Sequence, residues 1–315
     1  MSLLNPLTIR KKGVRAKAIM ALAVVCFFWG TTWIASKEGV RHMPPLQMAG
    51  MRQTLGGLCY VSYFIITGAR WPNRQQWRSI LVLGFLNFLI ANGLSTWGVK
   101  YISAGLGSII GAIFPLWLVV IGLFSPKKNI PIGAIFGLLI GFSGVCVIFY
   151  QRLHDFLNEE FRIGIFVSIL ATWGWAFGTI YTKKHAANFN PYFSIGLQML
   201  TSGITMLSIA NISGETIAFN KIPWQSWLSI AHLVVFGSVI SFMAYLYALQ
   251  NLSTEQASLY AYINPIVAVA LGALLFSEKV SIFIVMGGLV ALLGVYIVNK
   301  AYKVSATANP ETEGI

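Results

Sequence analysis

Charged residues are scarce in this sequence, and their scarcity excludes a large soluble domain. Only 10% of the 315 residues are Asp, Glu, Lys or Arg, and 57% are apolar, whereas soluble domains average about 25% and about 45–50%. A helical membrane span needs about 20 mostly apolar residues, so ten spans would use about two thirds of the chain. The composition therefore predicts an all-α, polytopic membrane protein with short connections.

Acidic residues are rarer still. Nine Asp and Glu stand against 22 Lys and Arg, a formal net charge of +13. In a soluble chain this excess would suggest nucleic acid as a partner, but here the basic residues lie at the ends of apolar runs rather than on one polar face. We therefore expect contact with the lipid bilayer and no nucleic acid.

The residues and motifs of enzymes and metal sites are also missing. The three cysteines lie within apolar runs without a CxxC pair or a histidine at metal spacing, and the chain has no HExxH, GxSxG or P-loop motif. Residues 105–111 are rich in glycine, but their spacing is not that of a dinucleotide loop. The sequence predicts no enzyme, no cofactor and no metal site.

Ten apolar runs define the expected spans. The first follows a cluster of basic residues, but it is too long for a signal peptide and lacks a small-residue cleavage site, so we expect it to remain uncleaved. The runs cover residues 18–38, 46–67, 78–98, 102–124, 131–149, 162–182, 191–210, 226–249, 255–276 and 281–299.

The distribution of Lys and Arg predicts the orientation. With the N-terminus inside, fourteen of them lie on the inner side and seven on the outer side, and cytoplasmic loops retain basic residues. We therefore expect both termini in the cytoplasm.

An internal duplication appears when the chain is compared with itself. Pro115 matches Pro265 at an offset of 150 residues, and Trp29 matches Trp173 at nearly the same offset. Because each half has five spans, an odd number, the second half is expected to insert in the opposite orientation, as in transporters whose substrate site lies near the midplane. The predicted parts are a basic N-terminus at 1–17, a first repeat at 18–149, an external linker at 150–161, a second repeat at 162–300 and a cytoplasmic tail at 301–315.

Small residues mark two helix faces. Gly133, Gly137 and Gly141 are spaced by four residues in the fifth run, as are Gly287 and Ala291 in the tenth. Small residues let helix backbones approach closely. We expect these two helices to pack against each other or against a neighbour at the repeat interface.

Arg52 is the one full charge placed well inside an apolar run. An isolated cation there is costly, so it should face the interior of the bundle. Two interpretations stay open: a structural hydrogen bond or outward snorkelling, and a contact with a substrate carboxylate or a gate. Its counterpart in the repeat, Gln198, is neutral, so only one half carries this charge.

Carboxylates are missing from the middle of the expected spans. Glu38 and Glu278 lie at outer helix ends, and Glu255 lies at an inner end. Proton-coupled transport generally uses a buried group that protonates during the cycle. His232 could titrate near neutral pH, but a single histidine near a helix end is typical of a structural residue. The missing mid-span carboxylate therefore favours a uniporter or facilitator, which moves its substrate down the substrate gradient.

Aromatic and polar residues at mid-span depth define the candidate substrate site. Interfacial belts do not account for Trp29 or Trp173, which either pack in the interior or form the walls of a substrate cavity. Pro265 frees a backbone carbonyl inside a span, and Pro115 supplies the matching break. The predicted substrate-binding residues are Trp29, Thr32, Trp33, Arg52, Asn92, Trp97, Trp173, Ser238, Tyr245, Tyr260, Tyr262 and Asn264.

Several segments together resemble a known family. Residues 29–33 (WGTTW), 44–52 (PPLQMAGMR), 175–178 (WAFG) and 258–265 (SLYAYINP) are similar to segments of the EamA-type drug/metabolite transporters, in particular their YedA-like inner-membrane members. The resemblance covers about residues 18–300. It implies ten helices in two inverted five-helix repeats, a central cavity, and export of amino acids or related small metabolites across the bacterial inner membrane.

The chain also departs from the family pattern. Members often carry a glutamate after the fourth helix, and the second repeat has Glu278 there, but residues 124–128 of the first repeat read FSPKK. Because of this departure, the resemblance does not predict how the cavity opens and closes.

The leading hypothesis is therefore export of small metabolites, with amino acids favoured, by alternating access. The expected partner is a small-molecule substrate, and the oligomeric state stays open. Efflux of lipophilic cationic drugs suits the aromatic residues but not the positive charge of Arg52. A non-transporting receptor or scaffold has little soluble surface for a partner, and an intramembrane enzyme lacks a nucleophile and a base.

Overall fold

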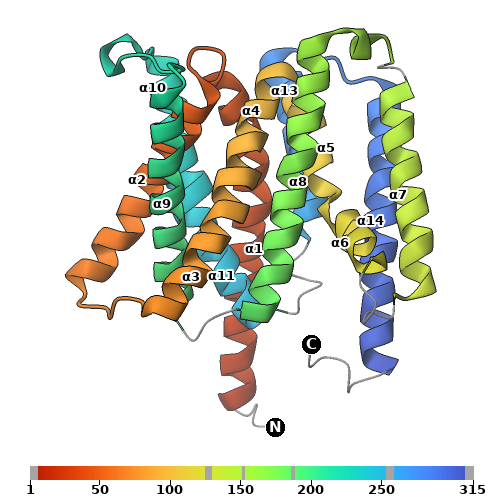
Figure 1. Ribbon diagram of the computed structural model, residues 1–315. Helices are drawn as coiled ribbons and strands as arrows, with labels where there is room; N and C mark the ends of the chain where they lie inside the picture. The colour runs from red at the N-terminus through yellow and green to blue at the C-terminus, as the bar shows by residue number, and fades with distance from the viewer. Residues whose placement is uncertain (1–5, 125–129, 151–152, 186–188, 253–258, 309–315) are drawn as a thin grey trace.

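The computed structural model describes residues 6–124, 130–150, 153–185, 189–252 and 259–308, and every regular element in these residues is a helix. The helices stand side by side in one bundle, with short connections at both ends (Figure 1). They are α1 (Pro6–Gly39), α2 (Pro45–Ile66), α3 (Arg74–Leu83), η1 (Gly84–Gly93), α4 (Leu94–Tyr101), α5 (Ala104–Ala112), α6 (Phe114–Leu123), α7 (Ile132–Tyr150), η2 (His154–Leu157), α8 (Glu159–His185), α9 (Pro191–Ile212), η3 (Phe219–Lys221), α10 (Trp224–His232), η4 (Leu233–Ile240), α11 (Ser241–Asn251), α13 (Tyr260–Phe276) and α14 (Ile282–Ala308). The predicted all-α class is confirmed.

Eight segments of the described chain are long and apolar enough to cross a membrane. They are Gly13–Gly39, Arg74–Tyr101, Ala104–Leu123, Ile132–Tyr150, Glu159–Thr182, Pro191–Ile212, Trp224–Asn251 and Ile282–Ser305. Two further helices occupy predicted spans but fall outside this set. In α2, Arg52 and two glutamines lower the mean hydropathy, and α13 has only 17 residues. The structure therefore supports a polytopic membrane protein, and a count of ten spans remains a prediction.

Polar residues set the starts of several helices. The Asn73 side chain accepts a hydrogen bond from the Gln76 backbone N–H at 2.9 Å, and the Gln76 side chain accepts one from the Asn73 N–H at 2.8 Å. This capping box satisfies backbone donors at the start of α3. At the start of α5, the Ser103 hydroxyl accepts from the Leu106 N–H at 3.1 Å.

Corresponding helices in the two halves have matching forms. Both α2 and α9 have 22 residues and begin with a proline, and both Arg74–Tyr101 and Trp224–Asn251 contain a π-helical segment, η1 and η4. Pro115 lies at the break between α5 and α6, and Pro265 lies inside α13. The duplication seen in the sequence is thus also visible in the helices.

The small-residue faces bring α7 and α14 into close contact, side by side in Figure 1. A Cβ atom at Gly137 would lie 2.8 Å from the Gly294 carbonyl oxygen, and one at Gly287 would lie 2.6 Å from the Gly144 carbonyl oxygen. The two backbones therefore touch where only glycine fits. This confirms the expectation that these two helices pack against each other.

Candidate functional site

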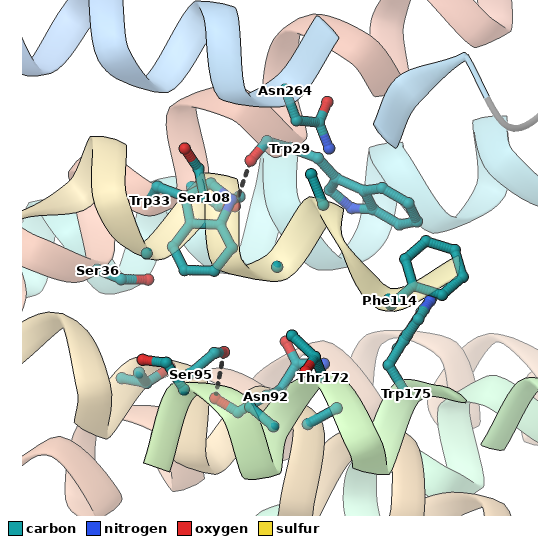
Figure 2. Close-up of a pocket in the computed structure, with 18 of the residues that line it drawn as sticks. Trp29, Trp33, Ser36, Asn92, Ser95, Ser108, Phe114, Thr172, Trp175 and Asn264 are labelled. Atoms are coloured by element: carbon teal, nitrogen blue, oxygen red, sulfur yellow. Dashed lines mark hydrogen bonds between the residues drawn. The ribbon is translucent and has the colours of Figure 1, made fainter. Parts of the chain in front are cut away.

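A cavity of about 170 Å³ lies inside the bundle, between α1, α5, α8 and α13, with further lining from α2, α4, α6, α11 and η1. One water molecule needs roughly 10–15 Å³ by this measure, so the cavity has room for a small organic ligand. Figure 2 shows Ser36 and Ser95 at one end of the cavity and Phe114 and Trp175 at the other.

Arg52 lines this cavity from α2, and its side chain is almost fully buried, with 6% exposed. Its Nε atom donates a hydrogen bond to the Ser238 hydroxyl at 3.2 Å. No acidic side chain is among the described residues that line the cavity, and none of them forms an ion pair with Arg52. A buried cation without a counter-ion is destabilising, so the cavity favours an anionic ligand group.

Gly237 makes this position of the guanidinium possible. A Cβ atom there would lie 3.1 Å from Nη2 of Arg52 and 2.7 Å from Cγ2 of Thr32. The Gly237 carbonyl oxygen also accepts a hydrogen bond from the indole N–H of Trp29 at 3.1 Å. The η4 segment thus supports both the cation and one aromatic wall of the site.

Aromatic rings form much of the cavity wall. The ring of Trp29 packs against Phe242, Tyr245 and Tyr260, with ring centroids 5.0–5.1 Å apart. Trp33, Phe114 and Trp175 supply further lining. Such walls provide apolar contact, and their π faces attract ammonium groups.

Several serine and threonine hydroxyl groups line the cavity. Each of five such residues donates its hydrogen to a backbone carbonyl one turn earlier in its own helix, at 2.6–3.1 Å: Thr32, Ser95, Ser108, Ser168 and Thr172. The hydroxyl oxygens keep lone pairs that accept hydrogen bonds. The cavity therefore combines one strong cationic donor with several neutral acceptors, which suits a ligand with both an acidic and an ammonium group.

Proline adds backbone acceptors to the same cavity. Pro265 has no N–H, so it cannot satisfy the carbonyl of Ala261, a lining residue. Beside it, the Asn264 amide is best oriented with Nδ2 donating to the carbonyl oxygens of Cys26 at 2.8 Å and Tyr260 at 3.0 Å. This orientation fixes α13 to α1 next to the break.

The structure brings most of the predicted site residues together. Those that line the cavity are Trp29, Thr32, Trp33, Arg52, Asn92, Tyr260 and Asn264. Ser238 and Tyr245 lie directly behind the lining, Ser238 as the hydrogen-bond partner of Arg52 and Tyr245 in ring contact with Trp29.

Three predicted residues lie elsewhere. Trp173 points away from the cavity, is 41% exposed and packs against Trp117. Trp97 is half-buried in α4 and is not part of the lining. Tyr262 accepts a hydrogen bond from Asn299 at 2.7 Å on the side of α13 that faces α14.

Trp175 takes the place in the cavity that the repeat assigns to Trp173. Two residues along an α-helix turn the side chain by about 200°, so only one of the pair can face the cavity. Trp175 belongs to the segment 175–178 that resembles the family, whereas the register of the repeat favours Trp173. The serine and threonine lining gave no comparable signal, because such hydroxyls also occur throughout apolar helices.

His232 lies outside the cavity lining. Its Nε2 atom forms a hydrogen bond with the Thr31 hydroxyl at 2.8 Å, and its ring packs against Phe28 and Phe236. These contacts fit the structural interpretation of this histidine.

A helical membrane bundle with a central polar and aromatic cavity is the architecture of a small-molecule carrier, and comparison with known proteins gives the family. The EamA-like transporter family matches the chain twice, over residues 16–150 and 162–300. The chain belongs to this family, and its EamA domain is duplicated.

Curated relatives extend over most of the chain. The uncharacterized inner membrane transporter YedA of Escherichia coli K12 is 27% identical over 268 residues, which cover 83% of each protein. The uncharacterized transporter YvbV of Bacillus subtilis is 25% identical over 296 residues, 93% of this chain and 95% of YvbV. A chloroplastic WAT1-related protein of Arabidopsis thaliana is 26% identical over 279 residues, 87% of this chain and 67% of that protein.

One solved crystal structure has the same fold. It matches with a TM-score of 0.63 at 15% sequence identity, and the match covers 91% of this chain and 98% of the other. At this identity the likeness concerns the fold alone.

Proposed function

We propose that this protein exports small zwitterionic metabolites, with amino acids favoured, by alternating access across a bacterial inner membrane. Its family is one of transporters, and a relative is named an inner membrane transporter. The observation that carries the choice of substrate is the buried guanidinium of Arg52, which enters a cavity whose described lining contains no acid.

Each group of an amino acid has a matching partner in this cavity. The carboxylate fits Arg52, because a charge-assisted hydrogen bond offsets the cost of the buried cation. The ammonium fits the hydroxyl oxygens and the freed carbonyl of Ala261, and an apolar side chain fits the rings of Trp29 and Trp175. We therefore favour hydrophobic and aromatic amino acids.

The proposed topology has ten spans in two inverted repeats, with both termini in the cytoplasm. It adds α2 and α13 to the eight apolar segments. The start of α1 and the end of α14 lie on the same side of the bundle in Figure 1, as an even number of spans requires. Neither catalysis nor a cofactor is part of the proposal, and we assign no oligomeric state.

Counterflow in proteoliposomes tests this function. Vesicles loaded with unlabelled phenylalanine should accumulate labelled phenylalanine transiently, and vesicles loaded with a hexose should not. Protein-free vesicles are the control. Absence of counterflow with a panel of amino acids, or equal counterflow with the hexose, contradicts the proposal.

A second candidate is efflux of lipophilic cationic compounds, which the aromatic wall favours. Arg52 opposes it, because a cationic ligand would meet a like charge in the cavity. Counterflow of a lipophilic quaternary ammonium compound in the same vesicles, without counterflow of any amino acid, would favour this candidate.

A further inference from the structure

The turn between α4 and α5 is held from one side by a lysine. Nζ of Lys37, near the end of α1, donates hydrogen bonds to the carbonyl oxygens of Lys100 at 3.2 Å and Ile102 at 2.9 Å. These carbonyls lie at the C-terminal end of α4, where the helix dipole favours a positive charge.

A glutamate holds the same turn from the other side. Oε1 of Glu278 accepts from the Ala104 N–H at 2.9 Å, and Oε2 accepts from the Gly105 N–H at 3.3 Å. These are the first two residues of α5, where unsatisfied N–H groups favour a negative charge. Lys37 and Glu278 thus place opposite charges against adjacent segments of the same turn.

The backbone after α13 is shaped to place this carboxylate. Ser277 adopts the left-handed conformation, with φ 51°, and the N–H of Glu278 bonds back to the Gly272 carbonyl at 3.1 Å. A Cβ atom at Gly272 would lie 2.5 Å from Oε2 of Glu278. The Glu278 side chain thus lies against the last turns of α13 and accepts hydrogen bonds from the start of α5.

A second contact ties the same helix ends together. The guanidinium of Arg41 lies 4.3 Å from the centre of the Phe276 ring and donates to Glu38 at 2.9 Å. The end of α13 is therefore held by residues that follow α1 as well as by its own contact with α5.

These contacts lie at one end of the cavity. Ser36, which lines the cavity, directly precedes Lys37, and Gly107 and Ser108 of α5 form part of the wall. These contacts therefore hold the start of α5 against α1 and α13 near the Ser36 end of the space shown in Figure 2.

The repeat places different side chains at the positions that correspond to Lys37 and Glu278. Lys37 corresponds to Tyr181, which has no charge, and Glu278 corresponds to Lys128, whose charge is of the wrong sign for a helix N-terminus. Lys128 lies outside the described residues, and the comparison uses its charge alone. The pair of opposite charges at Lys37 and Glu278 is therefore not repeated at the corresponding positions of the other half.

We propose that Lys37 and Glu278, assisted by Arg41 and Phe276, form a latch that closes the outer end of the cavity and opens to release substrate. The proposal rests on the proposed transport function and topology. It also implies that the resting protein is closed to the outside and waits for substrate from the cytoplasm.

Thiol accessibility tests the latch without any substrate, so its outcome is independent of counterflow. Ser36→Cys is introduced into a full-length protein whose Cys26, Cys59 and Cys146 are replaced by alanine. A charged, membrane-impermeant methanethiosulfonate is then added to the outer or the cytoplasmic side of oriented vesicles. Glu278→Gln removes the charge of the latch at constant size, and Lys37→Met is a second, independent variant. Lys279→Gln, at the exposed next position, is the matched control.

The latch requires Glu278→Gln and Lys37→Met to speed labelling from the outer side about tenfold or more, since each removes charge-assisted hydrogen bonds. Lys279→Gln should leave the rate unchanged. Equal rates in the latch variants and the control, in protein that elutes as a single folded species, overturn the proposal. A labelling rate that increases only from the cytoplasmic side would support a latch but overturn its assignment to the outer face.

Discussion

Arg52 enters the cavity and donates a hydrogen bond to Ser238, and Thr32, Ser108 and Thr172 line the same space. The position of Arg52 is not expected of a purely structural core, because burying a charge without a partner destabilises the fold. A bound carboxylate, as in the proposed substrate, would supply this partner. At the scale of residues, the proposed function therefore depends on whether the cavity binds a negatively charged group at Arg52.

The two tryptophans of α8 allow a matched test of the aromatic wall. Trp175→Ala removes a ring that lines the cavity, whereas Trp173→Ala removes one that is 41% exposed and packs on Trp117. We expect Trp175→Ala to raise the apparent Km for phenylalanine about tenfold, which corresponds to about 1.4 kcal/mol. Trp173→Ala should change it less than twofold. A larger effect at Trp173 would contradict the placement of the site.

Part of this site could be predicted from the sequence, and the missing part has a physical cause. Arg52, Trp29 and Asn264 were identifiable because a charge, a large ring and a proline-linked amide are unusual at mid-span. The repeat predicts Trp173 as a site residue because it matches Trp29, but α8 does not turn toward the cavity the face that α1 does. Which face of a helix points inward depends on its neighbours, and a sequence without clear amphipathicity does not encode it.

At the scale of elements, apolar runs predicted the helices well because the hydrocarbon core fixes their length. The small-residue spacing predicted the α7–α14 contact, since close backbone approach needs a side chain no larger than hydrogen or methyl. The π-helical segments η1 and η4 had no signal in the sequence. They depend on local bonds such as Asn92 Nδ2 to the Asn87 carbonyl at 2.8 Å, and on packing against distant helices.

Two adjacent glycines test the α7–α14 contact. A Cβ atom at Gly287 would lie 2.6 Å from the Gly144 carbonyl and 2.8 Å from the Ile148 N, whereas one at Gly288 would lie 3.5 Å from Ile109. Gly287→Ala should therefore destabilise the fold by about 1–3 kcal/mol through overpacking, and Gly288→Ala should be tolerated. Thermal unfolding of the purified variants in detergent checks this. Equal melting temperatures would mean that the two helices adjust freely.

At the scale of the whole molecule, two copies of one domain build a bundle whose halves differ at the functional positions. Arg52 has the neutral counterpart Gln198, and Glu278 has the basic counterpart Lys128. The duplication supplies two similar halves around one cavity, and under the proposals above these differences would place the substrate carboxylate in the first half and the carboxylate of the latch in the second.

The proposed topology predicts the location of reporters fused along the chain. Fusions after Arg74, Lys128 and Lys184 should report the cytoplasm, and a fusion after Asp155 should report the outside. The reason is the bias of Lys and Arg toward cytoplasmic loops together with ten spans. An external signal after Lys128 would contradict both the ten-span arrangement and the inverted repeat.

The lining of the cavity predicts how strongly transport depends on a pH difference. No acidic residue is among the described residues that line it, and His232 is engaged by Thr31 outside the lining. We therefore expect net flux to follow the substrate gradient and to depend only weakly on an imposed pH difference. Accumulation of substrate against its gradient, driven by a pH gradient alone, would contradict this, and His232→Gln would be the first variant to examine.

The most direct test of the central claim compares an amino acid with its amide, which lacks the carboxylate but keeps the amino group, in the Arg52→Gln variant, with Arg52→Lys as the charge-preserving control. A charge-assisted contact contributes roughly 1.5–3 kcal/mol. Arg52→Gln should therefore weaken the binding of phenylalanine by about one to two orders of magnitude and should not weaken the binding of phenylalaninamide, which has no carboxylate, and Arg52→Lys should recover part of the loss. Equal losses for the acid and the amide would contradict a carboxylate contact and would assign Arg52 to structure or gating.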